Sequence, residues 1–395
     1  MTKHLMHTYN RLPVTFTRGE AASLWDSEGK QYLDAISGIA VCGLGHANKD
    51  IANAIYEQAK TLVHTSNLYQ IENQKTLGDQ LCEISGLENA FFCNSGAEAN
   101  EAAIKLAKLF GRKKDIRKSS IIVMENSFHG RTLATISATG SRKVQAGFEP
   151  LMRGFVRAPY NDLEAIENIA SNDSSVVAIL VEPIQGEGGV NIPDAGYLAG
   201  LRDICDKNDW LLMLDEIQTG MCRTGEFFGF LHSDIKPDVM TLAKGLGNGF
   251  PIGACLAGGK AADIFSPGTH GSTFGGSPLA CKVASTVVNL LKDNHYDSKV
   301  KALGELITSR LKDKLQDIDG VIEIRGQGLI IGIELNKNCA ELVIEALNQG
   351  LLINVTADNV VRLLPPFVIT NEEALQIADM VSQLIKNFLA TATTS

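Results

Sequence analysis

Short apolar runs alternate with longer stretches of helical periodicity through the first two thirds of the chain. Strands buried inside a parallel sheet carry apolar side chains on both faces, and these runs are apolar throughout. The predicted strands are Ala90–Cys93, Ser120–Met124, Val176–Val181, Trp210–Leu214, Val239–Leu242 and Ala254–Ala257. Amphipathic helices such as Ala97–Phe110 and Gly196–Asn208 lie between them. This alternation predicts an α/β fold with a mostly parallel sheet.

The pattern changes after about Pro278. The predicted elements there are helices up to Leu291 and over Lys299–Leu315, Ala340–Asn348 and Asn371–Leu389, and strands at Val321–Arg325 and Leu329–Leu335. We therefore expect a large domain over residues 46–278 and a smaller α+β domain over 279–395. Residues 1–45, with strands at Ser23–Asp26 and Gln31–Asp34 around a turn at Gly29, are expected to pack with the smaller domain.

Composition and charge narrow the class of protein. A length of 395 residues exceeds that of a usual single domain. The net charge of −9 argues against a nucleic-acid surface. No apolar run is long enough to span a membrane, and Met1–Glu20 lacks the apolar core of a secretory signal. Eight scattered cysteines form no C-x-x-C pair, so neither a zinc site nor a disulfide framework is predicted. We expect a soluble cytoplasmic enzyme.

The first candidate site is Asn94–Asn100, which follows a predicted strand. Ser95 and Glu98 match the S-x-x-E capping box, so a helix is expected to begin here. A helix start with a glycine and free N–H groups is suited to binding phosphate. On this segment alone, an ordinary capped helix is the simpler interpretation.

Two further candidates follow predicted strands at the sheet edge where α/β proteins bind ligands. Asp215 ends an apolar strand, which suits a ligand partner, a metal ligand or a helix cap; no phosphate-binding G-x-x-x-x-G-K-[ST] motif accompanies it. Lys244 follows another strand and enters a glycine-rich bend. Burial there would lower the pKa of its amine and make it nucleophilic, as a Schiff-base lysine requires. The glycines of 186–189 and 245–249 lack the dinucleotide-binding pattern.

Taken in order, the motifs resemble the class III (ornithine-type) aminotransferases, which are fold-type-I pyridoxal-phosphate (PLP) enzymes. The resemblance covers nearly the whole chain. Its motifs are Leu24–Lys30, Gly38–Val41, Gly45–His46, Asn94–Asn100, Ser127–Arg131, Glu182–Gly189, Leu214–Gly220, Ala243–Gly245 and Gly271–Gly276.

The resemblance implies roles for the residues that contact the cofactor. Lys244 would hold PLP as a Schiff base and then act as the general base of the 1,3-proton shift. Asp215 would keep the pyridine nitrogen protonated. Phe128 would stack on the ring, Gln218 would contact its hydroxyl side, and His129 would support the site from behind. The phosphate would be bound by Ser95, Gly96 and Ala97.

The resemblance also implies a shared dimer site and a set of substrate contacts. Thr273 would reach the phosphate in the neighbouring subunit, which implies an obligate homodimer, and Ser272 would contact substrate. Arg362 would bind the α-carboxylate of 2-oxoglutarate or glutamate, and Arg131 a second carboxylate. Glu187 would pair with Arg362 when an ω-amine is presented.

Within the family, Gly38–Val41 and Glu187–Val190 are most similar to the enzymes of N-acetylornithine. Ile39 stands near the position where ornithine enzymes usually carry tyrosine, which leaves room for an acylated amine. Cys42 stands where acetylornithine enzymes often have asparagine, so the acyl preference stays open. The resemblance implies transfer of the δ-amino group of N²-acetylornithine to 2-oxoglutarate, a step of arginine biosynthesis. The alternative donors are ornithine, succinylornithine, succinyl-diaminopimelate and 4-aminobutyrate.

Overall fold

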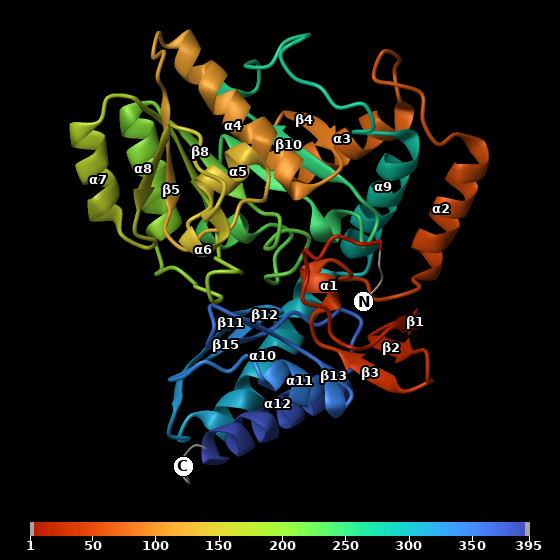
Figure 1. The fold of residues 1–395 in the computed structure, drawn as a ribbon. Helices are drawn as coiled ribbons and strands as arrows, with labels where there is room; N and C mark the ends of the chain where they lie inside the picture. The colour runs from red at the N-terminus through yellow and green to blue at the C-terminus, as the bar shows by residue number, and fades with distance from the viewer. Residues whose placement is uncertain (1–3, 392–395) are drawn as a thin grey trace.

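The computed structural model describes residues 4–391, which form three β-sheets and the helices packed on them (Figure 1). The largest sheet has the strand order β4-β10-β9-β8-β7-β5-β6. Its strands are β4 (Asn89–Cys93), β5 (Ser120–Met124), β6 (Phe155–Ala158), β7 (Val176–Val181), β8 (Leu211–Asp215), β9 (Val239–Leu242) and β10 (Gly253–Ala257). Within this sheet β10 runs opposite to the other six strands, so the predicted α/β fold with a mostly parallel sheet is confirmed.

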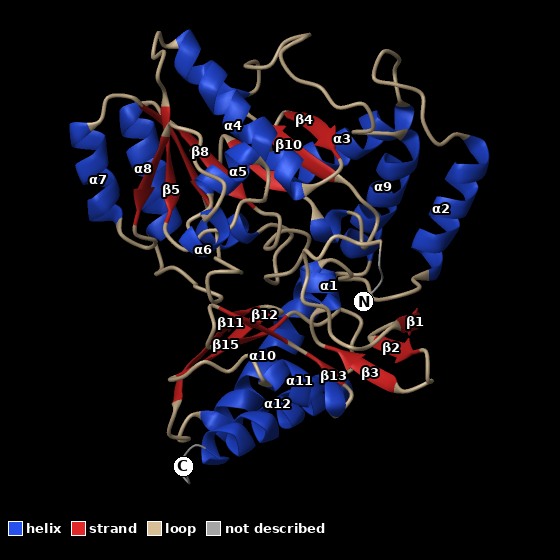
Figure 2. Ribbon diagram, in the orientation of Figure 1, coloured by secondary structure: helices blue, strands red, loops and turns tan. Residues whose placement is uncertain are grey.

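Helices cover both faces of this sheet (Figure 2). The helices of this part of the chain are α2 (Lys49–Thr61), α3 (Glu72–Ser85), α4 (Gly96–Lys113), α5 (Leu133–Ala138), α6 (Arg142–Gln145), α7 (Leu163–Asn172), α8 (Tyr197–Asn208) and α9 (Pro278–Asp293). Of these, α2 packs on α9. Successive side chains of a strand point to opposite faces, so β8 contributes Leu212 to the core shared with α8 and Met213 to the core shared with α4. This two-sided burial explains why the predicted strands are apolar throughout.

Two four-stranded sheets lie below the large sheet in Figure 1. One has the order β1-β2-β3-β13 and the other β11-β12-β15-β14. Their elements are β1 (Phe16–Glu20), β2 (Ser23–Asp26), β3 (Gln31–Asp34), α1 (Ser37–Ala40), α10 (Tyr296–Leu315), β11 (Val321–Gln327), β12 (Ile330–Leu335), α11 (Leu342–Asn348), β13 (Leu351–Leu352), β14 (Asn354–Thr356), β15 (Val360–Leu363) and α12 (Asn371–Thr391). The pairing of β3 with β13 joins the N-terminal strands to the C-terminal part of the chain.

Several elements differ from those that the sequence pattern predicts. The strand β8 is shifted by one residue, so that Asp215 is its last residue. The edge strand β6 was not predicted because it is short, partly exposed and carries Arg157. The strand β15, which carries Arg362, was not predicted either, because four residues give too short a pattern. Among residues 4–391, no helix has the length and apolar character needed to cross a membrane.

Candidate active site

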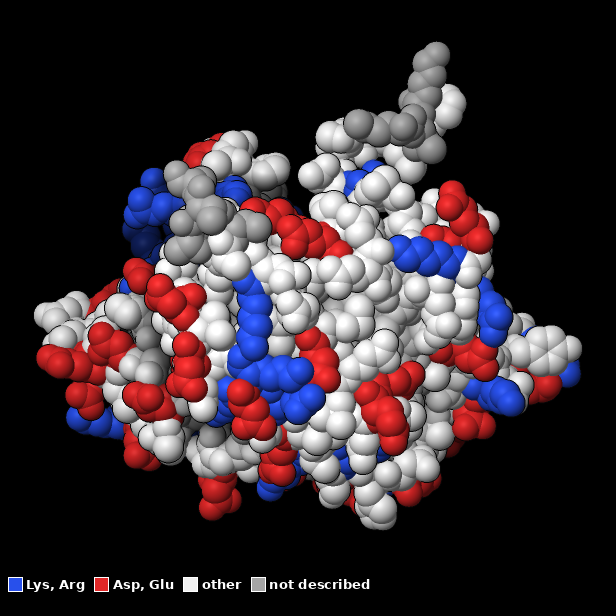
Figure 3. Space-filling view, turned by 90° about the horizontal axis from the view of Figure 1, so that it is seen from below, with Lys and Arg blue, Asp and Glu red and all other residues white. Residues whose placement is uncertain are grey.

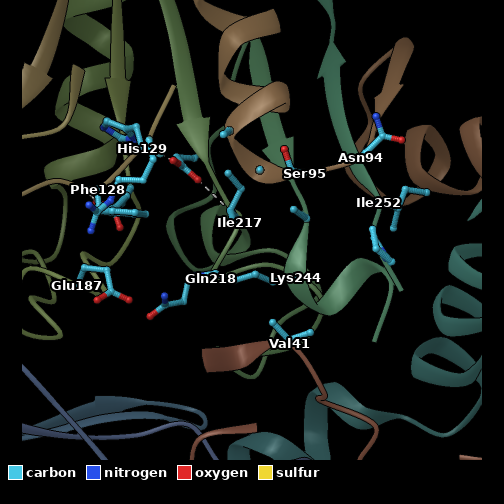
Figure 4. Close-up of a pocket in the computed structure, with 18 of the residues that line it drawn as sticks. Val41, Asn94, Ser95, Phe128, His129, Glu187, Ile217, Gln218, Lys244 and Ile252 are labelled. Carbon is cyan, nitrogen blue, oxygen red and sulfur yellow. Dashed lines mark hydrogen bonds and ion pairs between the residues drawn. The ribbon is translucent and has the colours of Figure 1, made fainter. Parts of the chain in front are cut away.

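A cavity of about 410 Å³ opens where the loops that follow the central strands meet the smaller sheets. Figure 4 shows Ser95, Phe128, Gln218 and Lys244 around this space. These residues come from four different segments, which the parallel sheet brings to one edge. On the face seen from below in Figure 3, acidic and basic side chains are interspersed. The volume of the cavity and the convergence of several segments on it make it the candidate site for a small molecule.

Lys244 begins a 3₁₀ turn, Lys244–Leu246, which Ala243 separates from the end of β9. Its backbone has φ +42°, in the left-handed region, which costs a non-glycine residue about 1–3 kcal/mol. Burial is the main cause that lowers the pKa of its amine. The negative charges of Glu187 and Asp215 raise this pKa, and the positive charge of Arg362 lowers it. The strained turn therefore presents a lysine whose amine loses its proton more readily than an exposed one.

Asp215, the last residue of β8, lies in the same cavity and is almost fully buried. Its Oδ2 accepts hydrogen bonds from Asn100 Nδ2 at 2.7 Å and His129 Nδ1 at 2.8 Å, and its Oδ1 accepts one from Ile217 N at 3.1 Å. Thr241 in turn donates to Asn100 Oδ1 at 2.8 Å. Three donors fix the plane of this carboxylate, and His129 lies behind it.

The helix α4 begins at the cavity with Ser95 as its N-cap. The Ser95 hydroxyl accepts a hydrogen bond from Glu98 N at 3.2 Å, as the capping box predicts. The reciprocal bond differs, because Glu98 Oε2 accepts from Asn94 N at 2.7 Å and not from the backbone of Ser95. Gly96 and Ala97 line the cavity, and a Cβ on Gly96 would lie 2.7 Å from Ile217 Cδ1. The positive end of an 18-residue helix thus faces the cavity.

Phe128 lines the cavity, and a buried carboxylate, Glu182, binds its backbone. Glu182 accepts a hydrogen bond from Phe128 N at 2.9 Å and a weaker one from Gly186 N at 3.3 Å. Burial, opposed by His129 and reinforced by the Asp215 charge, raises the pKa of Glu182 to about 7. Glu182 therefore ties the loop of Phe128 to the loop that carries Glu187.

Glu187 and Arg362 form an ion pair on the side of the cavity next to Lys244. Glu187 Oε1 lies 2.8 Å from Arg362 Nη1, and the Arg362 side chain is fully buried. Asn354 Oδ1 accepts from Arg362 Nε at 3.0 Å and Nη2 at 2.6 Å, and Gln218 Oε1 from Nη1 at 3.3 Å. Burial alone would raise the pKa of Glu187, but Arg362 holds it below its ordinary value. Arg131 lies at the cavity over the Phe128 ring.

Ser272 and Thr273 do not lie in the cavity of their own chain. Ser272 Oγ accepts hydrogen bonds from Asn94 Nδ2 at 3.2 Å and Gly275 N at 3.1 Å, whereas Thr273 is exposed. The loop that carries them is fixed by Asn67, whose Nδ2 donates to the carbonyls of Ser272 and Gly275. The chain therefore brings together every predicted site residue except these two.

A left-handed turn over residues 37–40, with φ between 44° and 66°, leads to Val41 on the cavity wall. Asp34 binds the backbone at the start of this turn and the side chain of His46. Its Oδ1 accepts from Ile36 N at 2.9 Å and Ser37 N at 2.8 Å, and its Oδ2 lies 2.7 Å from His46 Nε2. The hydrogen bond that Asp34 accepts from His46, with a smaller contribution from Cys42, raises the pKa of His46 to about 9.

Replacing Asp34 with asparagine is expected to remove a pH-dependent part of the folding stability. Because the pKa of His46 is raised in the folded chain from 6.5 to about 9, its pairing stabilises fully below pH 6.5 and is lost as pH rises to about 9. The free energy of unfolding of the wild type should exceed that of Asp34→Asn by about 1–3 kcal/mol at pH 6, and by less at pH 9. Urea unfolding at several pH values measures this difference; a difference independent of pH would contradict the assignment.

Comparisons with known proteins agree on one family. The profile described as Aminotransferase class-III matches residues 5–385. The acetylornithine aminotransferase of Nitrosomonas europaea is 58% identical over 386 residues, which are 98% of each chain. That of Methanothermobacter thermautotrophicus is 45% identical, covering 98% of this chain and 97% of its own. Among solved structures, the ornithine aminotransferase from Toxoplasma gondii superposes with a TM-score of 0.94 at 33% identity, over 99% of this chain and 94% of its own. The acetylornithine aminotransferase from Elizabethkingia anophelis superposes with a TM-score of 0.87 at 35% identity, over 97% of this chain and 96% of its own.

Proposed function

The chain belongs to the class III aminotransferases, and we propose that it transfers the δ-amino group of N²-acetylornithine to 2-oxoglutarate. The family makes it a PLP-dependent transaminase. The acetylated donor is supported by the relatives, since acetylornithine aminotransferases are 45–58% identical to this chain over nearly its full length. The observation that carries the proposal is the ion pair between Glu187 and Arg362 beside Lys244, because it lets one cavity accept both substrates.

The residues of the cavity fit PLP. The cofactor needs an amine for its aldehyde, an acid for its ring nitrogen and donors for its phosphate. The buried amine of Lys244, the three-donor carboxylate of Asp215 and the start of α4 offer these in one cavity. When bound, PLP supplies an electron sink for the carbanion that forms at the substrate carbon.

The family resemblance and the places of the residues in the cavity support these proposed roles. Lys244 would hold the cofactor through its amine and, once freed, would move the proton at the substrate carbon; its burial lowers the pKa of the amine for this task. Asp215 would keep the ring nitrogen protonated. Ser95, Gly96 and Ala97 would bind the phosphate at the positive end of α4. Phe128 and Gln218, which line the same cavity, would contact the ring.

Two arginines and one glutamate select the substrates. While Glu187 neutralises Arg362, Arg131 remains at the cavity as a carboxylate anchor, which suits a donor that presents its ω-amine next to Lys244. When 2-oxoglutarate enters, its α-carboxylate takes the place of Glu187 on Arg362, and its second carboxylate binds Arg131. A guanidinium fork binds a carboxylate through two parallel hydrogen bonds, so the exchange of partners preserves the pairing.

A panel of amine donors tests the substrate assignment. The purified holoenzyme is assayed with 2-oxoglutarate and N-acetylornithine, N-succinylornithine, N-succinyl-diaminopimelate, ornithine or 4-aminobutyrate, and glutamate formation is measured. We expect the highest kcat/KM with N-acetylornithine. A higher kcat/KM with ornithine or 4-aminobutyrate would contradict the proposal, and a preference for the succinylated donors would reassign the acyl group.

We propose a homodimer whose subunits share their active sites. Exposed apolar side chains, which monomers seldom gather in one patch, lie on two adjacent loops that Asn67 joins. They are Leu62, Val63, Leu68, Tyr69 and Phe274. Thr273 is exposed on the second loop, next to Phe274, where a partner subunit could receive it.

Thr273→Ala is expected to weaken PLP binding about tenfold while the protein stays dimeric, because one hydrogen bond to a charged phosphate is lost. Equilibrium titration of the apoenzyme with PLP and sedimentation measure the two properties. Thr269→Ala is the matched control, since Thr269 bonds within the same loop to Ser266 O at 2.7 Å. A fully active monomer, or unchanged PLP affinity in Thr273→Ala, would contradict the shared site.

We also propose the domain division at residues 45 and 278, a cytoplasmic location and a role in arginine biosynthesis. The pairing of β3 with β13 supports placing residues 1–45 with the C-terminal domain. All eight cysteines are free thiols, as is usual in a reducing compartment. The pathway follows from the substrate, because the names of the relatives point to acetylornithine.

A further inference from the structure

We propose that Arg325 positions the substrate gate: it fixes the turn of residues 186–191, here called the gate turn, on the C-terminal sheet. Only the Glu187 side chain then moves when a substrate carboxylate displaces it from Arg362. The inference rests on the proposed function, in which the pair of Glu187 and Arg362 opens and closes in each catalytic cycle.

Arg325 lies on β11 and uses all three of its guanidinium nitrogens. Its Nη2 donates to Gly189 O at 2.6 Å and its Nε to Val190 O at 2.9 Å. Its Nη1 donates to Glu323 Oε2 at 2.7 Å and Glu334 Oε2 at 2.6 Å, which orients the guanidinium group. The Arg325 side chain is only 12% exposed, so these hydrogen bonds are largely protected from water.

The gate turn is attached to the same sheet at further points. The Thr356 hydroxyl, on β14, donates to the carbonyl oxygen of Glu187, and Arg362, on β15, binds its carboxylate. The strands β11, β14 and β15 belong to one four-stranded sheet. The turn follows β7 of the large sheet in sequence, and its first residue, Gly186, donates a hydrogen bond to Glu182 there. Glu187, Gly189 and Val190 bind the C-terminal sheet. Glu187 and Arg362 therefore share one support.

The backbone of the gate turn is strained where Arg325 binds it. Val190 has φ +55°, a conformation that β-branched residues avoid, and its side chain is fully buried against Ile184, Ile330 and Leu364. Such a conformation persists only where the surroundings enforce it. The hydrogen bond from Arg325 to the carbonyl of this residue is one of those enforcing contacts. Without it, the turn is free to relax and Glu187 loses its fixed reach toward Arg362.

The test compares Arg325→Met and Arg325→Lys holoenzymes with wild type, through measurements that a general loss of stability would not reproduce. In Arg325→Met, amide hydrogen exchange should accelerate in the peptide covering 186–191 and not in the peptides of β8 and β9. The rate constant of the half-reaction with N-acetylornithine is divided by that of the half-reaction with glutamate. This ratio should fall about tenfold, as the loss of charge-assisted hydrogen bonds predicts. The non-reactive dicarboxylate glutarate should bind more tightly, because Arg362 is less well neutralised. Arg325→Lys, which keeps the charge and part of the bonding, should lie between Arg325→Met and wild type.

Arg310→Met is the matched control. Arg310 also makes two hydrogen bonds to a carboxylate, that of Asp379, at 2.7 and 3.1 Å, but its partner lies on α12, outside the gate turn. Arg310→Met should change neither the hydrogen exchange of 186–191, nor the ratio of half-reaction rate constants, nor the affinity for glutarate. An equal loss in both half-reactions, or unchanged exchange and glutarate affinity in both Arg325 variants, would overturn the proposal. Because exchange and glutarate binding need no amine donor, they stay informative if the donor panel shows that N-acetylornithine is not the substrate; the ratio is then measured with the donor preferred by wild type.

Discussion

Lys244→Ala is expected to lower kcat by about 10⁴-fold or more, which is the upper range for a lost general acid–base residue. Two tasks fail together in this variant, since the covalent link to PLP and the group that moves the proton are the same amine. Burial has lowered the pKa of this amine, so no exposed lysine is equally prepared to replace it. Stopped-flow measurement of each half-reaction separates this loss from weakened cofactor binding.

The absorbance of the purified protein provides the second measurement for Lys244→Ala. The visible band of the lysine-bound cofactor should be absent, while free PLP remains in the cavity at saturating concentration. Lys260→Ala is the control, because Lys260 follows β10 of the same sheet but pairs with Asp209. A Lys244→Ala protein that keeps the band and a tenth of the activity would show that another lysine carries the cofactor.

Asp215→Ala is expected to lower kcat by about 10²–10³-fold, the usual loss when one electrostatic contact to the reacting group is removed. The variant no longer holds the ring nitrogen protonated, so the ring withdraws electrons from the substrate carbon less strongly. Asn100 and His129 keep their places behind the site but lose the carboxylate that they now orient. Steady-state rates at saturating PLP measure the effect.

An N-methylated PLP distinguishes the charge effect from a general disturbance. This analogue carries a permanent positive charge on its ring nitrogen, and the shortened side chain in Asp215→Ala leaves room for the methyl group. Activity of Asp215→Ala should recover at least tenfold with the analogue, and wild type should gain nothing. An unaltered kcat in Asp215→Ala with ordinary PLP would show that Asp215 does not act on the ring.

The convergence of Asp215 and Lys244 could be predicted from the sequence because it depends only on local patterns and one topological rule. Each follows an apolar strand, and carboxyl ends of parallel strands lie at one edge of the sheet. In the structure β8 and β9 are neighbours, with Asp215 paired to Thr241, three residues before Lys244. The helix start at Ser95 was predictable for the same reason, since a capping box is a local signal.

The contacts of Glu182 and Arg325 could not be predicted in this way. Glu182 belongs to the motif Glu182–Gly189, but the hydrogen bond that it accepts from Phe128 N joins loops 54 residues apart. Arg325 contacts the gate turn across 135 and 136 residues, and the pattern of its own strand gives no sign of that partner. Thr273 illustrates the opposite case, because the family resemblance assigns it to a neighbouring subunit and the chain by itself leaves it exposed.

The most direct test of the account locates the cofactor on the chain and removes it with the proposed donor. The holoenzyme is reduced with borohydride and digested, and the modified peptide is identified by mass spectrometry. A parallel sample is incubated with N-acetylornithine, without 2-oxoglutarate, before reduction. We predict the label on Lys244 in the first sample and its loss in the second, because the amine of the donor displaces the lysine. A label on another lysine, or one on Lys244 that N-acetylornithine leaves in place, would contradict the account.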